Sequence, residues 1–208
     1  MRFGRSQLQA RRACVGTPIV TYDGKTYHTV QIGSQCWLKE NLDVGVMIQG
    51  TENASNNGVI EKYCYDNDLS NCTTYGGLYQ WNEAMSYNTS PGTKGICPTG
   101  WHIPTYAEYG TLKAEVNNDG NTLKEVGQGT GNGIGTNISG FSALLVGWRY
   151  YENNNVSFVS LRYNTYFWTS TKYDEPYAYD TGLEYDNSGI HLSHGTKEFG
   201  FSIRCLKD

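Results

Sequence analysis

The sequence predicts a single α+β domain, and three observations lead to this prediction. The chain has 208 residues, which is enough for one well-buried domain and does not require a second. Two segments before residue 117 carry helix signals, one through its apolar spacing and one through its capping residues. From Gly140 onward, short apolar runs alternate with Gly and Asn turns, which is typical of strands. We therefore expect two short helices followed by a strand-rich C-terminal part.

The first residues are expected to lie outside this domain. Residues 1–13 have no apolar periodicity, so we predict an N-terminal arm there and one domain over residues 14–208. The arm carries four arginines without a following apolar core, so it is neither an anchor nor a complete secretion signal. No apolar run in the chain approaches the ~20 residues that a membrane-spanning helix requires.

A β-hairpin opens the predicted domain. Two strand-like runs at 19–22 and 26–32 flank Asp23-Gly24, a dipeptide that favours a tight hairpin turn. The apolar side chains of Trp37, Leu38 and Leu42 are then expected to be buried, and residues 45–58 are expected to form a polar loop.

The helix signals follow the hairpin. Residues 61–65 suit a short strand, and the segment between Cys64 and Cys72 suits a turn tied by those two cysteines. Apolar residues recur at helical spacing over 77–85, which predicts a short helix with one buried face. A second helix begins after Thr105, because Thr105 and Glu108 have the spacing of a capping box.

Residues 117–139 are rich in Gly, Asn and Thr, with glycine at every second position from 127 to 135. A phosphate-binding loop would need a strand before it and a helix with Lys-Ser or Lys-Thr after it, and neither is present. We expect a long flexible surface loop.

Strands are predicted within 141–149, 166–170, 183–185, 190–192 and 199–206. Because side chains alternate along a strand, His191 points outward if Ile190 and Leu192 point inward. Tyr177 and Tyr179 share one face, opposite Ala178.

The six cysteines are scattered, without the paired CxxC spacing of a zinc ribbon, which favours disulfides over metal. Six cysteines allow fifteen pairings. Their spacing favours two local bridges, Cys14 to Cys36 and Cys64 to Cys72, which leaves Cys97 to join Cys205. The alternative, six reduced thiols in a cytoplasmic protein, stays open at this point.

Composition points to recognition rather than to nucleic-acid binding. The net charge of -4 and the 17% charged fraction lack the basic surface that phosphate-backbone binding needs. Eight of the 17 tyrosines lie between residues 150 and 185, among Asn, Ser, His and Asp residues. Tyr supplies rigid contact area and Asn and Ser supply adaptable hydrogen bonds, as in binding surfaces. Cross-strand packing of the same rings is the competing interpretation.

Six blocks of sequence resemble the bacterial paralogous-domain family often called FISUMP, the Fibrobacter succinogenes major paralogous domain. They occur in order along residues 14–208: GSQCWLKENL at 33–42, YGGLY at 75–79, CPTGWHIPT at 97–105, GFSA at 140–143, FWTST at 167–171 and GFSIRC at 200–205. This family is similar to the C-type lectin fold. The resemblance implies two helices packed on a mixed, mostly antiparallel sheet, with termini that lie close together.

The Trp168-centred block and the ending at 200–204 also resemble the variable proteins of diversity-generating retroelements. In those proteins adenine-directed mutagenesis rewrites chosen C-terminal positions, and a C-type lectin fold displays them as a binding site. Randomising both adenines of an Asn codon cannot yield Lys or Glu, so we expect fixed residues at Glu152, Lys172, Glu175, Glu184, Lys197 and Glu198. Scaffold residues are expected at Gly147, Trp148, Trp168, Gly200, Phe201 and Arg204. The predicted ligand-binding residues are Tyr150, Asn153, Arg162, Tyr163, Tyr173, Tyr177, Tyr179, Tyr185, His191 and His194.

No catalytic residue, metal site or cofactor is predicted. Calcium-dependent lectins use Glu-Pro-Asn or Gln-Pro-Asp with Trp-Asn-Asp, whereas this chain has Glu175-Pro176-Tyr177 and Trp81-Asn82-Glu83. No nucleophile motif occurs, and six paired cysteines would leave no thiol for the oxidation chemistry of the related formylglycine-generating enzymes.

We therefore expect a secreted or cell-surface protein that binds a macromolecular ligand, a protein in the first place, with carbohydrate as the alternative ligand. Nucleic acid is not expected as a partner. Two other functions compete with this one: a surface structural or adhesin module without a varied site, and, third, an enzyme.

Overall fold

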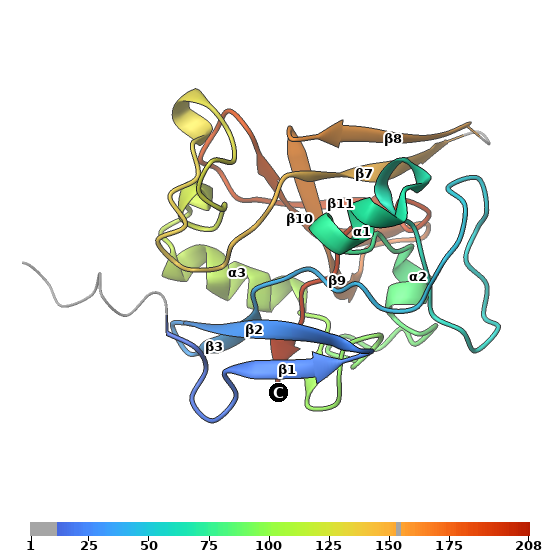
Figure 1. The fold of residues 1–208 in the computed structure, drawn as a ribbon, viewed down its shortest axis with the longest axis horizontal. Coiled ribbons are helices and arrows are strands. Elements are labelled where there is room, and N and C mark those ends of the chain that lie inside the picture. The colour runs from blue at the N-terminus through green and yellow to red at the C-terminus, as the bar shows by residue number, and fades with distance from the viewer. Residues whose placement is uncertain (1–11, 153–154) are drawn as a thin grey trace, which may run out of the picture.

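Two five-stranded sheets form the framework of the domain (Figure 1). The computed structural model describes residues 12–152 and 155–208. Sheet content dominates, and the described chain contains three short α-helices, so the α+β expectation holds at the level of class. The expectation of two helices on one sheet is too simple, because a third helix and a second sheet are present.

The N-terminal sheet has the strand order β1-β2-β3-β12-β6 and is antiparallel throughout. Its first two strands form the predicted hairpin, in which Asp23 and Gly24 both have positive φ angles (49° and 72°), as the tight turn requires. The strands are β1 (Ile19–Tyr22), β2 (Lys25–Ile32), β3 (Gln35–Leu38), β6 (Trp101–His102) and β12 (Leu206–Lys207).

The C-terminal sheet has the strand order β11-β10-β9-β7-β8 and is mixed, because β7 pairs with β9 in parallel while the other pairs are antiparallel. Its strands are β7 (Val146–Glu152), β8 (Asn155–Leu161), β9 (Asn164–Lys172), β10 (Tyr177–Glu184) and β11 (His191–Thr196). Short parallel strands β4 (Val46–Met47) and β5 (Glu61–Lys62) form a separate pair.

The helices are α1 (Leu69–Tyr75), α2 (Trp81–Ala84) and α3 (Tyr106–Glu115), with 3₁₀ turns η1 (Tyr65–Asn67), η2 (Gly120–Thr122) and η3 (Gly131–Gly133). The capping box predicted for α3 is confirmed: the Thr105 hydroxyl accepts from the Glu108 amide, and the Glu108 carboxylate accepts from the Thr105 amide at 2.7 Å.

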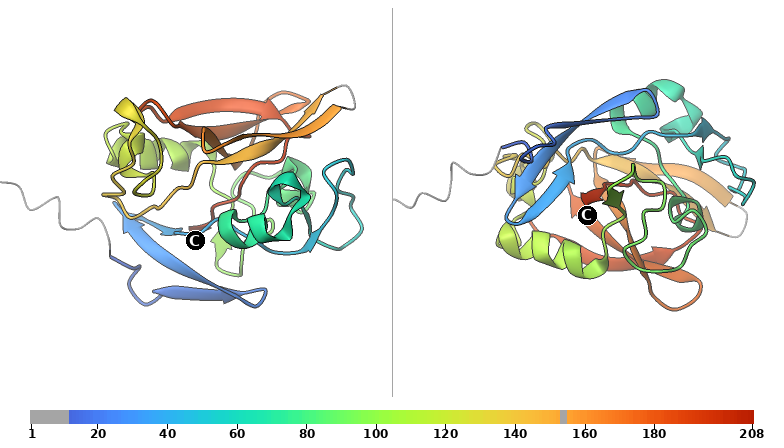
Figure 2. Two further views of the ribbon diagram at one scale, coloured as in Figure 1. Left: turned by 45° about the horizontal axis from the view of Figure 1, so that its top comes forward. Right: turned by 90° about the horizontal axis from the view of Figure 1, so that it is seen from below.

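The end of the chain runs between the two sheets before it joins the N-terminal one (Figure 2). Isolated bridges connect Gly200 to Arg149, Phe201 to Tyr79 and Ser202 to Phe167 in turn. Most of the strand predicted for 199–206 is therefore absent. Each of these residues bonds to a different neighbour, and only β12 at the end forms a ladder.

Buried aromatic side chains fill the space around this segment. One core cluster contains Leu38, Trp81, Trp101, Trp168 and Phe201. A second cluster packs α3 against both sheets and contains Trp37, Tyr109, Phe141, Phe167 and Leu183. Trp37 and Leu38 are adjacent in β3 and enter different clusters, because successive side chains of a strand point to opposite faces.

Arg204 anchors the C-terminal segment from inside. Its guanidinium is 1% exposed and donates to the Asn41 side-chain oxygen and to the carbonyls of Leu38 and Phe141. Burial lowers the pKa of Arg204 to about 10. The guanidinium thus ties three segments that are far apart in sequence, in keeping with its predicted scaffold role.

The three predicted disulfides are all present: Cys14–Cys36, Cys64–Cys72 and Cys97–Cys205. The third joins Cys97, in the segment before β6, to Cys205, the residue before β12, and the two cysteines are 108 residues apart in sequence. At the N-terminal side, Lys207 donates to the Thr17 hydroxyl at 2.7 Å, so the two ends of the described domain lie together.

Three local predictions were wrong. The segment between Cys64 and Cys72 is not a simple turn, because Asp68 caps α1 by accepting from the Ser70 amide. The helix predicted for 77–85 is reduced to α2, since Leu78 and Tyr79 make β-bridges instead. The strand run that was expected from Phe141 begins only at Val146.

Two further differences concern loops and edges. Strand β8 was not predicted, although Val156 and Phe158 alternate with polar residues there. The glycine-rich region 117–139 is a loop as expected, yet it is tied to the sheet: the buried Lys124 ammonium donates to the carbonyls of Glu184 and Asn187.

Among residues 12–152 and 155–208, no helix is long and apolar enough to cross a membrane.

Candidate binding site

Four of the predicted ligand-binding residues meet at one end of the C-terminal sheet, around the β9–β10 turn. Tyr179 and His194 face each other as register partners on β10 and β11. The Tyr173 ring stacks on the His194 ring at a centroid distance of 4.3 Å and lies 5.0 Å from the Tyr179 ring, while Tyr177 lies 5.5 Å from His194. Tyr173, Tyr177 and His194 are exposed, and Tyr179 is half-buried.

Tyr106 adds a fifth ring from outside the predicted segment. It is the first residue of α3, and its ring lies 4.3 Å from that of Tyr179. We call Tyr106, Tyr173, Tyr177, Tyr179 and His194 the aromatic patch. Tyr106 was not predicted as a site residue, because it lies nearly 70 residues before Tyr173 in the sequence, although the capping box places it in the first turn of a helix.

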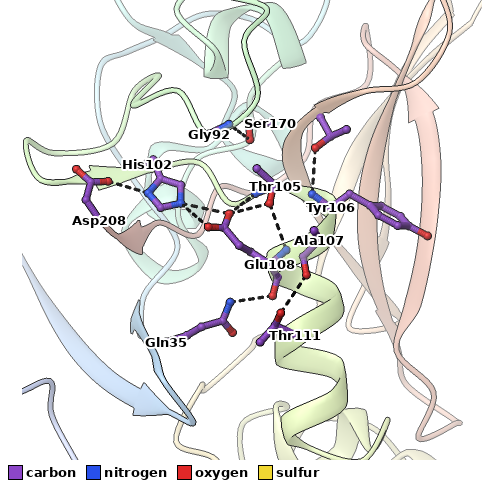
Figure 3. A network of polar contacts seen from close by, with 11 residues as sticks. Gln35, Gly92, His102, Thr105, Tyr106, Ala107, Glu108, Thr111, Ser170 and Asp208 are labelled. Carbon is purple, nitrogen blue, oxygen red and sulfur yellow. Dashed lines mark hydrogen bonds and ion pairs between the residues drawn. The ribbon is translucent and has the colours of Figure 1, made fainter.

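A polar network fixes the helix end that carries Tyr106 (Figure 3). His102 lies between two carboxylates, with Nδ1 2.7 Å from Asp208 Oδ1 and Nε2 3.1 Å from Glu108 Oε1. Hydrogen bonding to Glu108 raises the pKa of His102 against the effect of burial, and Asp208 raises it further. Burial acts to raise the pKa of Glu108, but the hydrogen bonds from His102 and Thr105 outweigh it and lower that pKa.

The same helix end is tied directly to the C-terminal sheet. The Tyr106 amide donates to the Thr171 hydroxyl of β9 at 3.1 Å, and the Gly92 amide donates to the Ser170 hydroxyl at 2.8 Å. The position of Tyr106 relative to Tyr179 is therefore set by hydrogen bonds to the strand that also leads to Tyr173.

An ion pair between Lys197, which directly follows β11, and Glu175 stabilises the β9–β10 turn. Lys197 is buried, and its ammonium lies 2.5 Å from Glu175 Oε1 and 4.7 Å from the centre of the Trp81 ring. The Lys197 amide also donates to the Pro176 carbonyl at 3.0 Å. The bond with Lys197 lowers the pKa of Glu175. Two of the residues that were expected to be fixed therefore hold the turn that carries the exposed rings.

Three other predicted residues lie apart from the patch. Arg162, Tyr163 and Tyr185 line a separate groove, with the rings of Tyr163 and Tyr185 4.8 Å apart. The structure therefore divides the predicted site instead of gathering it.

The remaining predicted residues belong to neither group. Tyr150 is half-buried against Phe199, at a centroid distance of 5.6 Å. His191 lies on β11 with its ring 3.7 Å from Glu184, and because it is three residues from His194 on the same strand, it lies on the opposite face. Asn153 lies outside the described residues.

One buried acid lies on the sheet face opposite the patch. Asp180 follows Tyr179 on β10, is 2% exposed, and its Oδ1 has no hydrogen-bond partner. Burial alone raises the pKa of Asp180 to about 7. Since Tyr179 and Asp180 are adjacent on a strand, this carboxyl does not contribute to the aromatic patch.

The patch carries aromatic and hydrogen-bonding groups. All six cysteines, which lie within the described residues, are in disulfides. In the described part of the chain, no group of three or more His, Cys, Asp and Glu residues is placed to hold a metal ion. Chemically, the patch offers ring faces, four phenol groups, of which those of Tyr173 and Tyr177 belong to exposed residues, and one imidazole, which suits contact with another molecule.

Comparison with curated proteins and with solved structures gives no match. A family model does match: the Fibrobacter succinogenes major domain covers residues 30–207, which is most of the chain and includes every strand of both sheets except β1 and residues 25–29 of β2. The resemblance seen in the sequence blocks is thereby confirmed, and the chain belongs to the Fibrobacter succinogenes major domain family.

Proposed function

We propose that this domain is a non-catalytic, ligand-binding domain of C-type lectin type, and that its aromatic patch binds a partner protein. The observation that carries the proposal is the gathering of five rings at the β9–β10 turn, three of them exposed. Tyr and His rings of this kind provide contact area at a small cost in side-chain entropy. Binding hot spots are likewise enriched in clustered aromatic anchors.

The bracing of the turn supports the proposal. A binding surface gains affinity when its backbone is already ordered, because less conformational entropy is lost on association. Lys197, Glu175 and the α3 network fix the backbone around the patch without using the patch rings. The rings can then change in identity while the turn keeps its shape.

This division suits diversification of the patch. Lys197 and Glu175 cannot arise from adenine randomisation of an Asn codon, and both make structural contacts. Tyr173, Tyr177, Tyr179 and His194 are reachable by such randomisation, and three of them are exposed. The three disulfides support a secreted or cell-surface location, where such bonds persist.

Binding is tested with one triple variant and one double variant of the whole chain. Partners are captured by cross-linking from the secreted and surface fractions of the source organism, identified, purified and titrated. We expect Tyr173→Ala/Tyr177→Ala/His194→Ala to weaken binding at least ~100-fold, since hot-spot truncations each cost ~2 kcal/mol or more. Tyr163→Ala/His191→Ala, which removes exposed rings outside the patch, is the matched control and should bind as wild type.

Unchanged affinity of the triple variant would refute the proposed site. Diversification has its own test: the locus is sequenced in related genomes, and differences should concentrate in the codons of Tyr173, Tyr177, Tyr179 and His194. Differences spread evenly over the domain would instead favour a structural or adhesin module.

A further inference from the structure

A second concave site lies at the opposite end of the C-terminal sheet from the aromatic patch. It has a volume of about 580 Å³ and is lined by the glycine-rich loop at 127–130, the β8–β9 turn at 161–163 and Tyr185 after β10, together with Tyr75 and Leu145. We call it the Arg162 groove. Its volume falls within the range of ~300–1,000 Å³ that is usual for small-molecule sites.

The glycines bring the loop into position. A Cβ on Gly129 would lie 2.2 Å from the Gly133 carbonyl oxygen, and a Cβ on Gly133 would lie 2.1 Å from the Tyr185 carbonyl oxygen. The Thr130 amide donates to that same Tyr185 oxygen at 2.7 Å. Only glycine permits this close approach, so Gly129 and Gly133 allow the loop to pack against the end of β10.

The groove has one charge. Arg162 is the only charged residue among those that line it. Its side chain is exposed, and within the described residues its guanidinium makes no hydrogen bond or ion pair. Arg162 also has a φ angle of +69°, and Ser160 two residues earlier has +62°. Such a backbone is costly for residues other than glycine, and it recurs at functional sites.

The walls offer ring faces and amide groups. Tyr163 is 54% exposed and stands nearly perpendicular to Tyr185, at an interplanar angle of 73°. Gln128 uses its amide oxygen to accept from the Leu145 amide at 2.9 Å, which leaves its NH₂ group as a donor. The negative face of an aromatic ring attracts polarised C–H groups, and planar amides and guanidinium groups bond to oxygens.

We infer that the Arg162 groove binds an acidic sugar, a pyranose that carries a carboxylate. A pyranose presents C–H groups to Tyr163 and hydroxyls to Gln128 and the loop backbone, while its carboxylate pairs with the guanidinium fork of Arg162. A neutral sugar would leave the single charge of the groove unused. The inference does not depend on protein binding at the aromatic patch.

The test uses two ligands that differ only in the carboxylate, methyl glucuronide and methyl glucoside. Backbone amide shifts of the whole chain are followed by NMR as each is titrated. We expect shifts at 127–130 and 161–163, and affinity for the glucuronide at least ~10-fold higher, as for a charge-assisted hydrogen bond. Glucuronide binding that perturbs other residues, equal affinity for both ligands, or binding of neither would overturn the inference.

Variants separate the charge from the fold. Arg162→Asn removes the charge while keeping a residue that tolerates the left-handed backbone, and it should abolish the preference for the glucuronide. Arg162→Lys should retain part of it, because Lys is a point charge without the planar fork. Tyr173→Ala/Tyr177→Ala/His194→Ala should bind the glucuronide as wild type, which distinguishes this site from the patch. An Arg162→Asn variant that still prefers the glucuronide would refute the role of Arg162.

Discussion

Strand β9 contains two kinds of aromatic residue, and the contrast between them shows how the domain is organised. Phe167 and Trp168, in its middle, are 1% and 0% exposed and lie in different core clusters on the two faces of the sheet. Tyr173, just beyond its end, is 40% exposed, and its ring packs against the rings of Tyr179 and His194. The ring of Trp168 thus belongs to the core, whereas the ring of Tyr173, five residues later, belongs to the surface.

The contrast teaches that the same strands carry buried core rings at one position and exposed patch rings at another. Disulfides, buried indoles and the Arg204 contacts hold the sheets together, whereas the patch rings rest on an already fixed turn. Substitutions in the two regions should differ in kind. The following experiments measure that difference, beginning with the largest expected effect.

Removal of the long-range disulfide should cost the most. For Cys97→Ala/Cys205→Ala we expect a loss of about 4–5 kcal/mol in the free energy of unfolding, because the bond closes a loop of 108 residues. The Cys64–Cys72 bond spans a sequence separation of only 8 residues, so Cys64→Ala/Cys72→Ala should cost about 2–3 kcal/mol by the same chain-entropy relation. Urea unfolding measures both. A short-loop variant that is less stable than the long-loop variant would show that strain or local packing dominates instead.

Truncation of the buried indole of β9 comes next. Trp168→Ala should lower the free energy of unfolding by about 3–5 kcal/mol, because it opens a cavity beside Phe201 and removes one of the two donors to the Tyr79 carbonyl, the other being the Phe201 amide. Tyr173→Ala in the same strand region is the matched control, with an expected change within about 1 kcal/mol. Equal losses would remove the distinction between core and patch rings.

The His102 network should make stability depend on pH. The folded-state pKa of His102 is raised above 6.5, so its stabilisation is fully present below about pH 6.5 and is lost as pH rises through the folded-state value. Relative to His102→Gln, the wild type should be more stable by about 1.5–3 kcal/mol near pH 5.5, with a smaller difference at pH 8.5.

His28→Gln controls for the loss of any histidine–carboxylate pair. His28 pairs with Glu40 at 2.8 Å, but its side chain is 61% exposed, so the pair should contribute about 0–1 kcal/mol. Chemical unfolding at several pH values compares the two variants. A difference for His102→Gln that grows with pH would contradict the assigned protonation.

The smallest effect on stability is expected at the aromatic patch. Tyr177→Ala and His194→Ala should each change the free energy of unfolding by about 0.5 kcal/mol or less, since both side chains are exposed. Tyr179→Ala should cost somewhat more, about 0.5–1.5 kcal/mol, through its ring contact with Tyr106. Thermal unfolding of the three variants ranks them, and a large loss at Tyr177 would assign this ring to the framework.

Much of the fold was predictable where the signal is local. The Asp23-Gly24 turn, the Thr105–Glu108 capping box and the two short-range disulfides each depend on residues close in sequence. The third disulfide followed because only two cysteines were left. Predictions failed where neighbours distant in sequence compete for the backbone, as at Leu78, whose amide and carbonyl bond to Tyr63 instead of forming a helix.

The sequence by itself determined which residues are suited to recognition and which family the chain belongs to. Only the tertiary structure decided which of the candidate residues meet. It joined Tyr106 to Tyr179 and separated Tyr163 and Tyr185 from Tyr173. The physical reason is that composition and periodicity report on single strands and helices, whereas a binding surface forms where the ends of several elements are brought together by packing.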